Sequence, residues 1–84
     1  MIKKIYGVYD TKQAIFINFM ITENQTNLIR DLKAVVNAKE SQSYLALYPE
    51  DFALHCIGSI ETSTGQVESL NHEIVCEIAS LKEK

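Results

Sequence analysis

Residues 52–65, with the sequence FALHCIGSIETSTG, carry the clearest structural pattern of the chain. Two sets of side chains alternate along it: Leu54, Cys56, Gly58 and Ile60 on one side, and Ala53, His55, Ile57 and Ser59 on the other. This period of two predicts a strand over residues 52–61. Thr62 to Gly65 has hairpin-turn chemistry, with Gly65 able to take a positive φ, so residues 66–70 are expected to return as a short second strand.

A second hairpin is predicted at the start of the chain. Residues 5–9 are rich in β-branched and aromatic side chains, residues 10–13 are polar enough to turn, and an apolar run follows from Ala14 to Ile21. Alternation places Ile15, Ile17, Phe19 and Ile21 on one face of that run and Phe16, Asn18 and Met20 on the other. Because both faces are nearly apolar, this strand is predicted to be central in its sheet or covered by a partner chain.

Helical spacing appears in two segments. Thr22 and Gln25 have the form of a capping box, and the apolar residues that follow predict a helix over about residues 23–38: Leu28, Ile29, Leu32, Val35 and Val36. Residues 38–48 are expected to form a loop and then a short helical turn or extended segment, ended by the turn at Pro49. Asn71 is predicted to cap a last helix with an apolar stripe of Ile74, Val75, Ile78 and Leu81.

Together these elements predict a two-layer α+β protein: an antiparallel sheet of about four strands with two helices, in the order ββαββα. With 84 residues, the chain is expected to be a single domain, 1–84, with one modest core. A sheet this small leaves a face and its edges open, and the second strand is apolar on both sides, so a homodimer or a protein partner is expected.

Composition limits the classes of protein. Hydrophobic residues make up 46% of the chain, and no tract approaches the roughly 20 apolar residues that a bilayer requires. The first residues lack a cleavage-type pattern, so we expect no signal peptide and a cytoplasmic location. Cys56 and Cys76 are too few for a disulfide scaffold. Glycines are isolated and no two cysteines are close together, so we expect neither an enzyme, nor a cofactor, nor a metal site.

Charge is distributed unevenly along the chain. The net charge is −3, which does not by itself favour binding to nucleic acid. Residues 1–40 carry six positive and four negative side chains, a balance of +2, whereas residues 41–84 carry two against seven, a balance of −5. A phosphate-facing surface is therefore expected in the first half.

Single-strand binding needs cations that follow phosphates and aromatic faces on which bases stack. The candidate DNA-binding residues are Lys3, Lys4, Tyr6, Tyr9, Lys12 and Phe16 on the first hairpin, and Arg30 and Lys33 on the helix. The competing interpretation is that these aromatic side chains belong to the core or an edge and that the lysines only solubilise the surface.

Two motifs link the chain to a known family. They are KKIYGVYDTK at residues 3–12 and YPEDFALHCIG at residues 48–58, followed by Thr64-Gly65. With them the chain resembles the nonstructural DNA-binding protein of gokushovirus-type microviruses, which are small phages with single-stranded DNA genomes. The chain departs from that pattern at residues 15–19, where relatives often have prolines, and at Tyr48, where histidine is expected. The resemblance brings no binding residues of its own.

The resemblance implies a bacteriophage protein of the host cytoplasm that binds DNA during viral DNA replication. Its role would be in the switch from duplex replication to single-stranded genome synthesis and genome packaging. The acidic total charge favours an alternative: a non-enzymatic interaction protein that modulates a phage or host replication protein without direct DNA contact.

Overall fold

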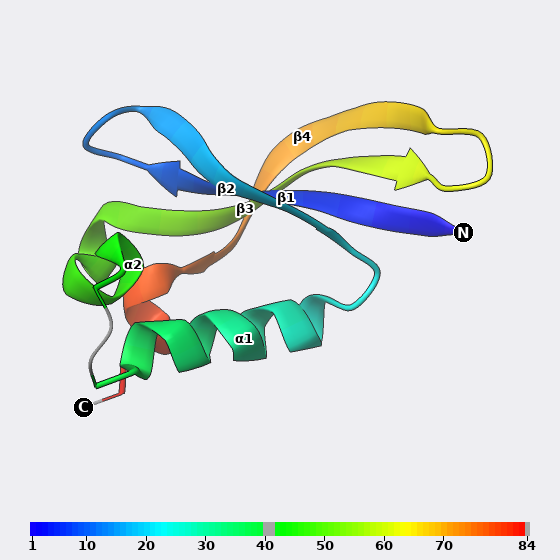
Figure 1. Cartoon of the computed structure of the whole chain (residues 1–84). Coiled ribbons are helices and arrows are strands. Elements are labelled where there is room, and N and C mark those ends of the chain that lie inside the picture. The colour runs from blue at the N-terminus through cyan, green and yellow to red at the C-terminus, as the bar shows by residue number, and fades with distance from the viewer. Residues whose placement is uncertain (40–41, 84) are drawn as a thin grey trace.

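The computed structural model describes residues 1–39 and 42–83, with backbone only at residues 71 and 72. Four antiparallel strands form one sheet in the order β2-β1-β3-β4 (Figure 1). Their bounds are Ile2–Asp10 for β1, Ile15–Thr22 for β2, Phe52–Glu61 for β3 and Gln66–Glu77 for β4. Both predicted hairpins are confirmed, and Gly65 takes its expected positive φ of 75° in the second turn.

One face of the sheet is covered by helical segments. Figure 1 shows them together beneath the strands: α1 (Gln25–Asn37), α2 (Tyr44–Leu47), and two 3₁₀ turns, η1 (Pro49–Asp51) and η2 (Ile78–Leu81). The core lies between the two layers and consists of Tyr6, Val8, Leu32, Val36, Leu45, Phe52, Leu54, Cys56 and Ile78. The predicted α+β class is confirmed. None of the helices formed by the described residues is long and apolar enough to cross a membrane.

The start of α1 differs from the predicted capping box. Asn24 is the N-cap, and its Oδ1 accepts a hydrogen bond from the backbone N–H of Asn27 at 3.0 Å. Thr22 instead accepts from the backbone N–H of Asn24. Gln25 does not close a box because its Oε1 accepts the hydroxyl of Tyr6 at 3.0 Å. Gln25, which the sequence motif assigned to the helix cap, is instead hydrogen-bonded to the core residue Tyr6.

The predicted last helix from Asn71 is wrong. Strand β4 continues to Glu77, paired with β3, and only η2 follows it. The register of β4 shifts at two places, between the partners of Leu54 and His55 and between those of Cys56 and Gly58. These irregularities break the alternation of side chains along β4. Without that alternation, the apolar residues of the segment have a spacing in the sequence that resembles the spacing of a helix. Ile78 is nevertheless buried, as the stripe predicted.

Strand β2 lies at the edge of the sheet, so the prediction of a central strand is wrong. Ile15, Phe19 and Ile21 on this strand are exposed. The strand carries no charged residue, although charges are a common protection of sheet edges. The other prediction, that a partner chain covers β2, stays a prediction.

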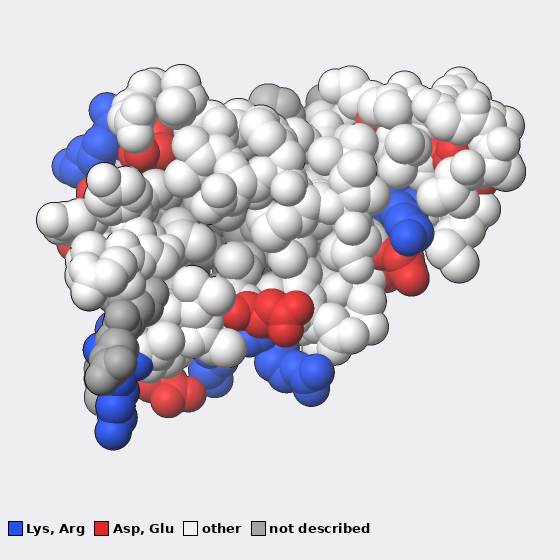
Figure 2. All heavy atoms as spheres, viewed as in Figure 1, with Lys and Arg blue, Asp and Glu red and all other residues white. Residues whose placement is uncertain are grey.

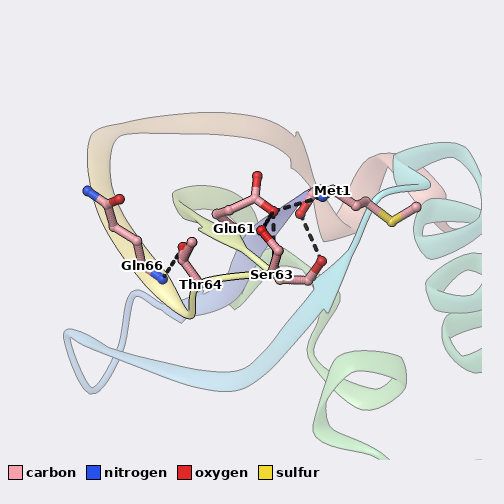
Figure 3. A network of polar contacts seen from close by, with 6 residues as sticks. Met1, Glu61, Ser63, Thr64 and Gln66 are labelled. Carbon is pink, nitrogen blue, oxygen red and sulfur yellow. Dashed lines mark hydrogen bonds and ion pairs between the residues drawn. The ribbon is translucent and has the colours of Figure 1, made fainter.

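The end of the β3–β4 hairpin projects past the beginning of α1 (Figure 1) and is held by the start of β1. The Met1 ammonium lies 2.8 Å from the Glu61 carboxylate, which also accepts the backbone N–H and hydroxyl of Ser63 (Figure 3). The ammonium and these Ser63 hydrogen bonds lower the pKa of Glu61 to about 2. The network ties the chain start to the hairpin turn.

Candidate nucleic-acid interface

Four rings form a cluster on the face of the sheet opposite the helices. We call Tyr9, Phe16, Phe19 and His55 the aromatic patch. The ring centroids of Tyr9 and Phe16, which are paired across β1 and β2, are 4.9 Å apart. Phe16 meets His55 edge-on at 5.4 Å and Phe19 at 6.5 Å. These are the spacings of favourable aromatic pairs, so the rings support one another.

The patch depends on a bulge at Asn18. This residue has a φ of 52°, and the register between β1 and β2 shifts beside it. In a regular strand, residues 16 and 19 would point to opposite faces. The extra residue places Phe16 and Phe19 on the same face, which the sequence-based assignment of faces did not foresee. An asparagine within an apolar strand was the available signal, because asparagine tolerates this conformation.

Gly7 lies beneath two rings of the patch. A Cβ atom built at Gly7 would lie 3.1 Å from Cδ1 of Phe16 and 3.2 Å from Cε1 of Phe19. The rings therefore cover a position with no side chain. Phe19 remains 61% exposed, whereas Tyr9, Phe16 and His55 are half-buried. The patch thus exposes the ring of Phe19, which lies beside three half-buried rings.

The structure separates the predicted cations into two groups. Lys3 lies on the same face as the aromatic patch by strand alternation, 3.6 Å from Glu23, and the exposed Lys12 lies in the β1–β2 turn. Lys4 is exposed but points to the other face. Arg30 and Lys33 are exposed on α1, on the helical side of the molecule, where Lys33 lies 3.5 Å from Glu83. They are not brought together with the patch.

Charged side chains are absent from a large part of the surface shown in Figure 2. Figure 2 shows charged side chains along the lower edge of the view, where α1 lies, and at both ends of the molecule, with a broad uncharged area at the centre. Apolar side chains extend the face of the patch beyond its rings. Ile21 is paired with Ile5 on that face and Ile74 with His55, and both Ile21 and Ile74 are exposed.

Tyr6 is removed from the candidate surface. Its side chain is 1% exposed, within the core, and its hydroxyl donates to Gln25. Burial, and to a lesser extent the Cys56 thiol, raises the pKa of Tyr6. A ring enclosed in this way cannot stack on a base. Sequence reasoning missed Phe19 and His55, which take its place on the open face.

Comparison with known families identifies the class of the chain. A family model described as Phage ORF5 protein matches residues 3–81. The chain belongs to this family, and the predicted bacteriophage origin is confirmed. No curated protein and no solved structure matches the chain.

Proposed function

We propose that this phage protein binds single-stranded DNA by stacking bases on the aromatic patch. The observation that carries the proposal is the open ring of Phe19, set beside Phe16 and Tyr9 on the uncovered face of a four-stranded antiparallel sheet. Sheets of this kind bind unpaired bases on exposed aromatic side chains in other nucleic-acid-binding folds. Duplex bases are stacked on each other and offer no such faces, so the single strand is preferred.

Two cations serve this surface. Lys3 lies at one end of the face and Lys12 in the turn at the other end, so a strand that crosses the patch meets both. Two phosphate contacts to a single strand correspond to a slope of about −1.4 in a plot of log affinity against log salt. Such a slope is shallow, which agrees with a protein whose net charge is −3. Stacking therefore supplies most of the specificity for unpaired DNA.

The biological role proposed with this activity is that of a nonstructural phage protein. It acts in the host cytoplasm, during the switch from duplex replication to single-stranded genome synthesis and packaging. Support for this role comes from the sequence resemblance and from membership of the Phage ORF5 protein family. The proposal involves no catalysis, cofactor or metal.

Fluorescence anisotropy of a labelled oligonucleotide of about 12 nucleotides, within the site sizes of small single-strand-binding folds, tests the proposal. Phe19→Leu keeps an apolar side chain and removes the aromatic face. It should weaken binding by about 5-fold to 150-fold, the equivalent of one lost stacking contact of about 1–3 kcal/mol. Unchanged affinity of Phe19→Leu, or equal affinity for a duplex competitor, would refute stacking on the patch.

Lys12→Ala and Arg30→Ala form a matched pair for the charge contribution. Lys12→Ala should reduce the salt slope by about 0.7, because one phosphate contact is lost. Arg30→Ala should leave it unchanged, since Arg30 lies on the helical side of the molecule. A larger effect of Arg30→Ala would move the DNA to α1.

The exposed edge strand β2 favours a second candidate function, that of an interaction protein. The strand has no charged side chain, and the exposed Ile15 and Ile21 suit contact with a second copy of the chain or with a phage or host replication protein. Sedimentation of the native protein and of Ile15→Lys tests the homodimer. A dimer lost in Ile15→Lys would support β2 as the interface, and a monomeric native protein would exclude the second copy.

A further inference from the structure

A cleft of about 640 Å³ lies on the helical side of the sheet, between the β1–β2 turn and α2. Its volume falls in the range of small-molecule sites, about 300–1,000 Å³. Leu45 and Phe52, both buried, contribute apolar lining, and Ile17 adds to it from β2. The cleft is separate from the aromatic patch, which faces the other way.

Two tyrosines line the cleft from the α2 side. The rings of Tyr44 and Tyr48 are stacked with centroids 6.3 Å apart and planes at 29°. Their exposures are 69% and 51%, large for aromatic side chains beside a small core. The pair therefore offers a flat face to a planar ligand, which an isolated ring would hold less rigidly.

Polar residues also line the cleft. Asn18, Gln42 and Asp51 are among its lining residues, and Lys12 is the one cation among them. Amides pair with the edges of bases, and a carboxylate accepts the exocyclic amino group of a base such as cytosine. An ammonium nearby suits a phosphate.

The turn beside the cleft is fixed before any ligand arrives. The buried Asp10 accepts hydrogen bonds from the backbone N–H groups of Lys12 and Gln13, at 2.9 and 3.2 Å, and from the Gln13 amide at 2.8 Å. Thr11 donates its N–H and its hydroxyl to the backbone carbonyl of Asp51. The carboxylate of Asp10 is thus occupied with the turn. Asp51 is therefore the lining residue whose carboxylate we assign to recognition of a ligand. Preorganisation of this kind lowers the cost of binding.

We propose that this cleft holds one unstacked nucleotide whose base carries an exocyclic amino group, with Tyr44 and Tyr48 against the base, Asp51 on the amino group and Lys12 on the phosphate. The inference rests on the proposed single-strand binding and extends it. Neighbouring residues of the hairpin face opposite sides: Tyr9 belongs to the aromatic patch and Asp10 to the cleft. A strand that leaves the patch over Lys12 therefore arrives at the cleft.

The test is an amide NMR titration of the full chain with the mononucleotides dCMP and TMP, because TMP lacks the exocyclic amino group. dCMP should shift residues 11–18 and 43–52 and bind more tightly than TMP. Tyr44→Ala should weaken dCMP binding by about 5-fold or more, as for one lost stacking contact. Asp51→Ala, which removes the acceptor, should abolish the preference for dCMP. Arg30→Ala, at an exposed position of α1 outside both the cleft and the aromatic patch, is the control and should leave dCMP binding unchanged.

The outcomes separate this inference from the proposed function. If the oligonucleotide binds in a Phe19-dependent manner but dCMP shifts no residue of the cleft, the nucleotide cleft is refuted and single-strand binding stands. If dCMP binds in the cleft but no oligonucleotide binds, single-strand binding fails and the cleft stands as a site for a free nucleotide. Equal binding of TMP and dCMP, or dCMP binding that survives Tyr44→Ala, would overturn the proposed recognition.

Discussion

Gly58→Ala should destabilise the protein, because the backbone of the neighbouring strand β4 lies too close to residue 58 of β3 for a side chain. A Cβ atom at residue 58 would lie 2.7 Å from the backbone carbonyl oxygen of Glu68, which cannot rotate away as a side chain would. Overpacking of this kind costs about 1–3 kcal/mol. The lower conformational entropy of unfolded alanine offsets about 0.4–1 kcal/mol of this cost. The middle of each range, about 2 and about 0.7 kcal/mol, gives an expected net loss of about 1.3 kcal/mol.

Urea and thermal unfolding followed by circular dichroism measure this loss. For a protein of this size, a loss of about 1.3 kcal/mol lowers Tm by roughly 5–10 °C. Ser59→Ala, at the next position of β3, is the control and should stay within about 0.5 kcal/mol of the native protein. A Gly58→Ala protein as stable as the native one would show that β4 does not approach β3 this closely.

Three further predictions follow from single contacts. Gly7→Ala should cost less stability than Gly58→Ala, because the neighbours of its Cβ are ring atoms that can shift. It should nevertheless weaken oligonucleotide binding in the anisotropy assay, because the new methyl group displaces Phe19. An affinity equal to that of the native protein would contradict this role of Gly7. The pKa of Glu61 is lowered from 4.5 to about 2. The stabilisation of the folded protein by its ion pair should therefore be complete above pH 4.5 and lost as the pH falls toward 2. A Glu61 carboxyl resonance that titrates above pH 4 by NMR would contradict this. Asn24→Ala should cost about 1 kcal/mol in urea unfolding by removing the α1 cap, and an effect near zero would leave the cap without a role.

Local pattern was sufficient for most of the fold. Strand β3 has the predicted bounds, and α1 differs from its prediction by one or two residues at each end. The order of the strands was not accessible, because the apolar character of β2 fits a buried central strand as well as an edge strand that exposes its side chains. The last helix failed for a related reason: irregular pairing in β4 removed the alternation that marks a strand.

The candidate site was predicted in part. Tyr9 and Phe16 lie on the open face, whereas Tyr6, which is on the same strand as Tyr9 but points to the opposite face, lies in the core. Alternation alone groups residues of one strand by face, but it does not say which face the helices cover. Arg30 and Lys33 share the positive first half of the sequence with Lys3 and Lys12, yet the fold carries them to the other side. Charge counted along a chain does not establish a surface.

The bulge at Asn18 bears on both candidate functions. It brings Phe16 and Phe19 to one face, and it also interrupts the outer edge of β2 at mid-strand. Bulges are one of the means by which natural sheets prevent another strand from pairing along an exposed edge. Continuous pairing of β2 with a second chain is thereby disfavoured, whereas contact with the side chains of its outer face is not. This geometry favours a ligand that lies across the aromatic patch, as a single strand of DNA does, over a strand that extends the sheet.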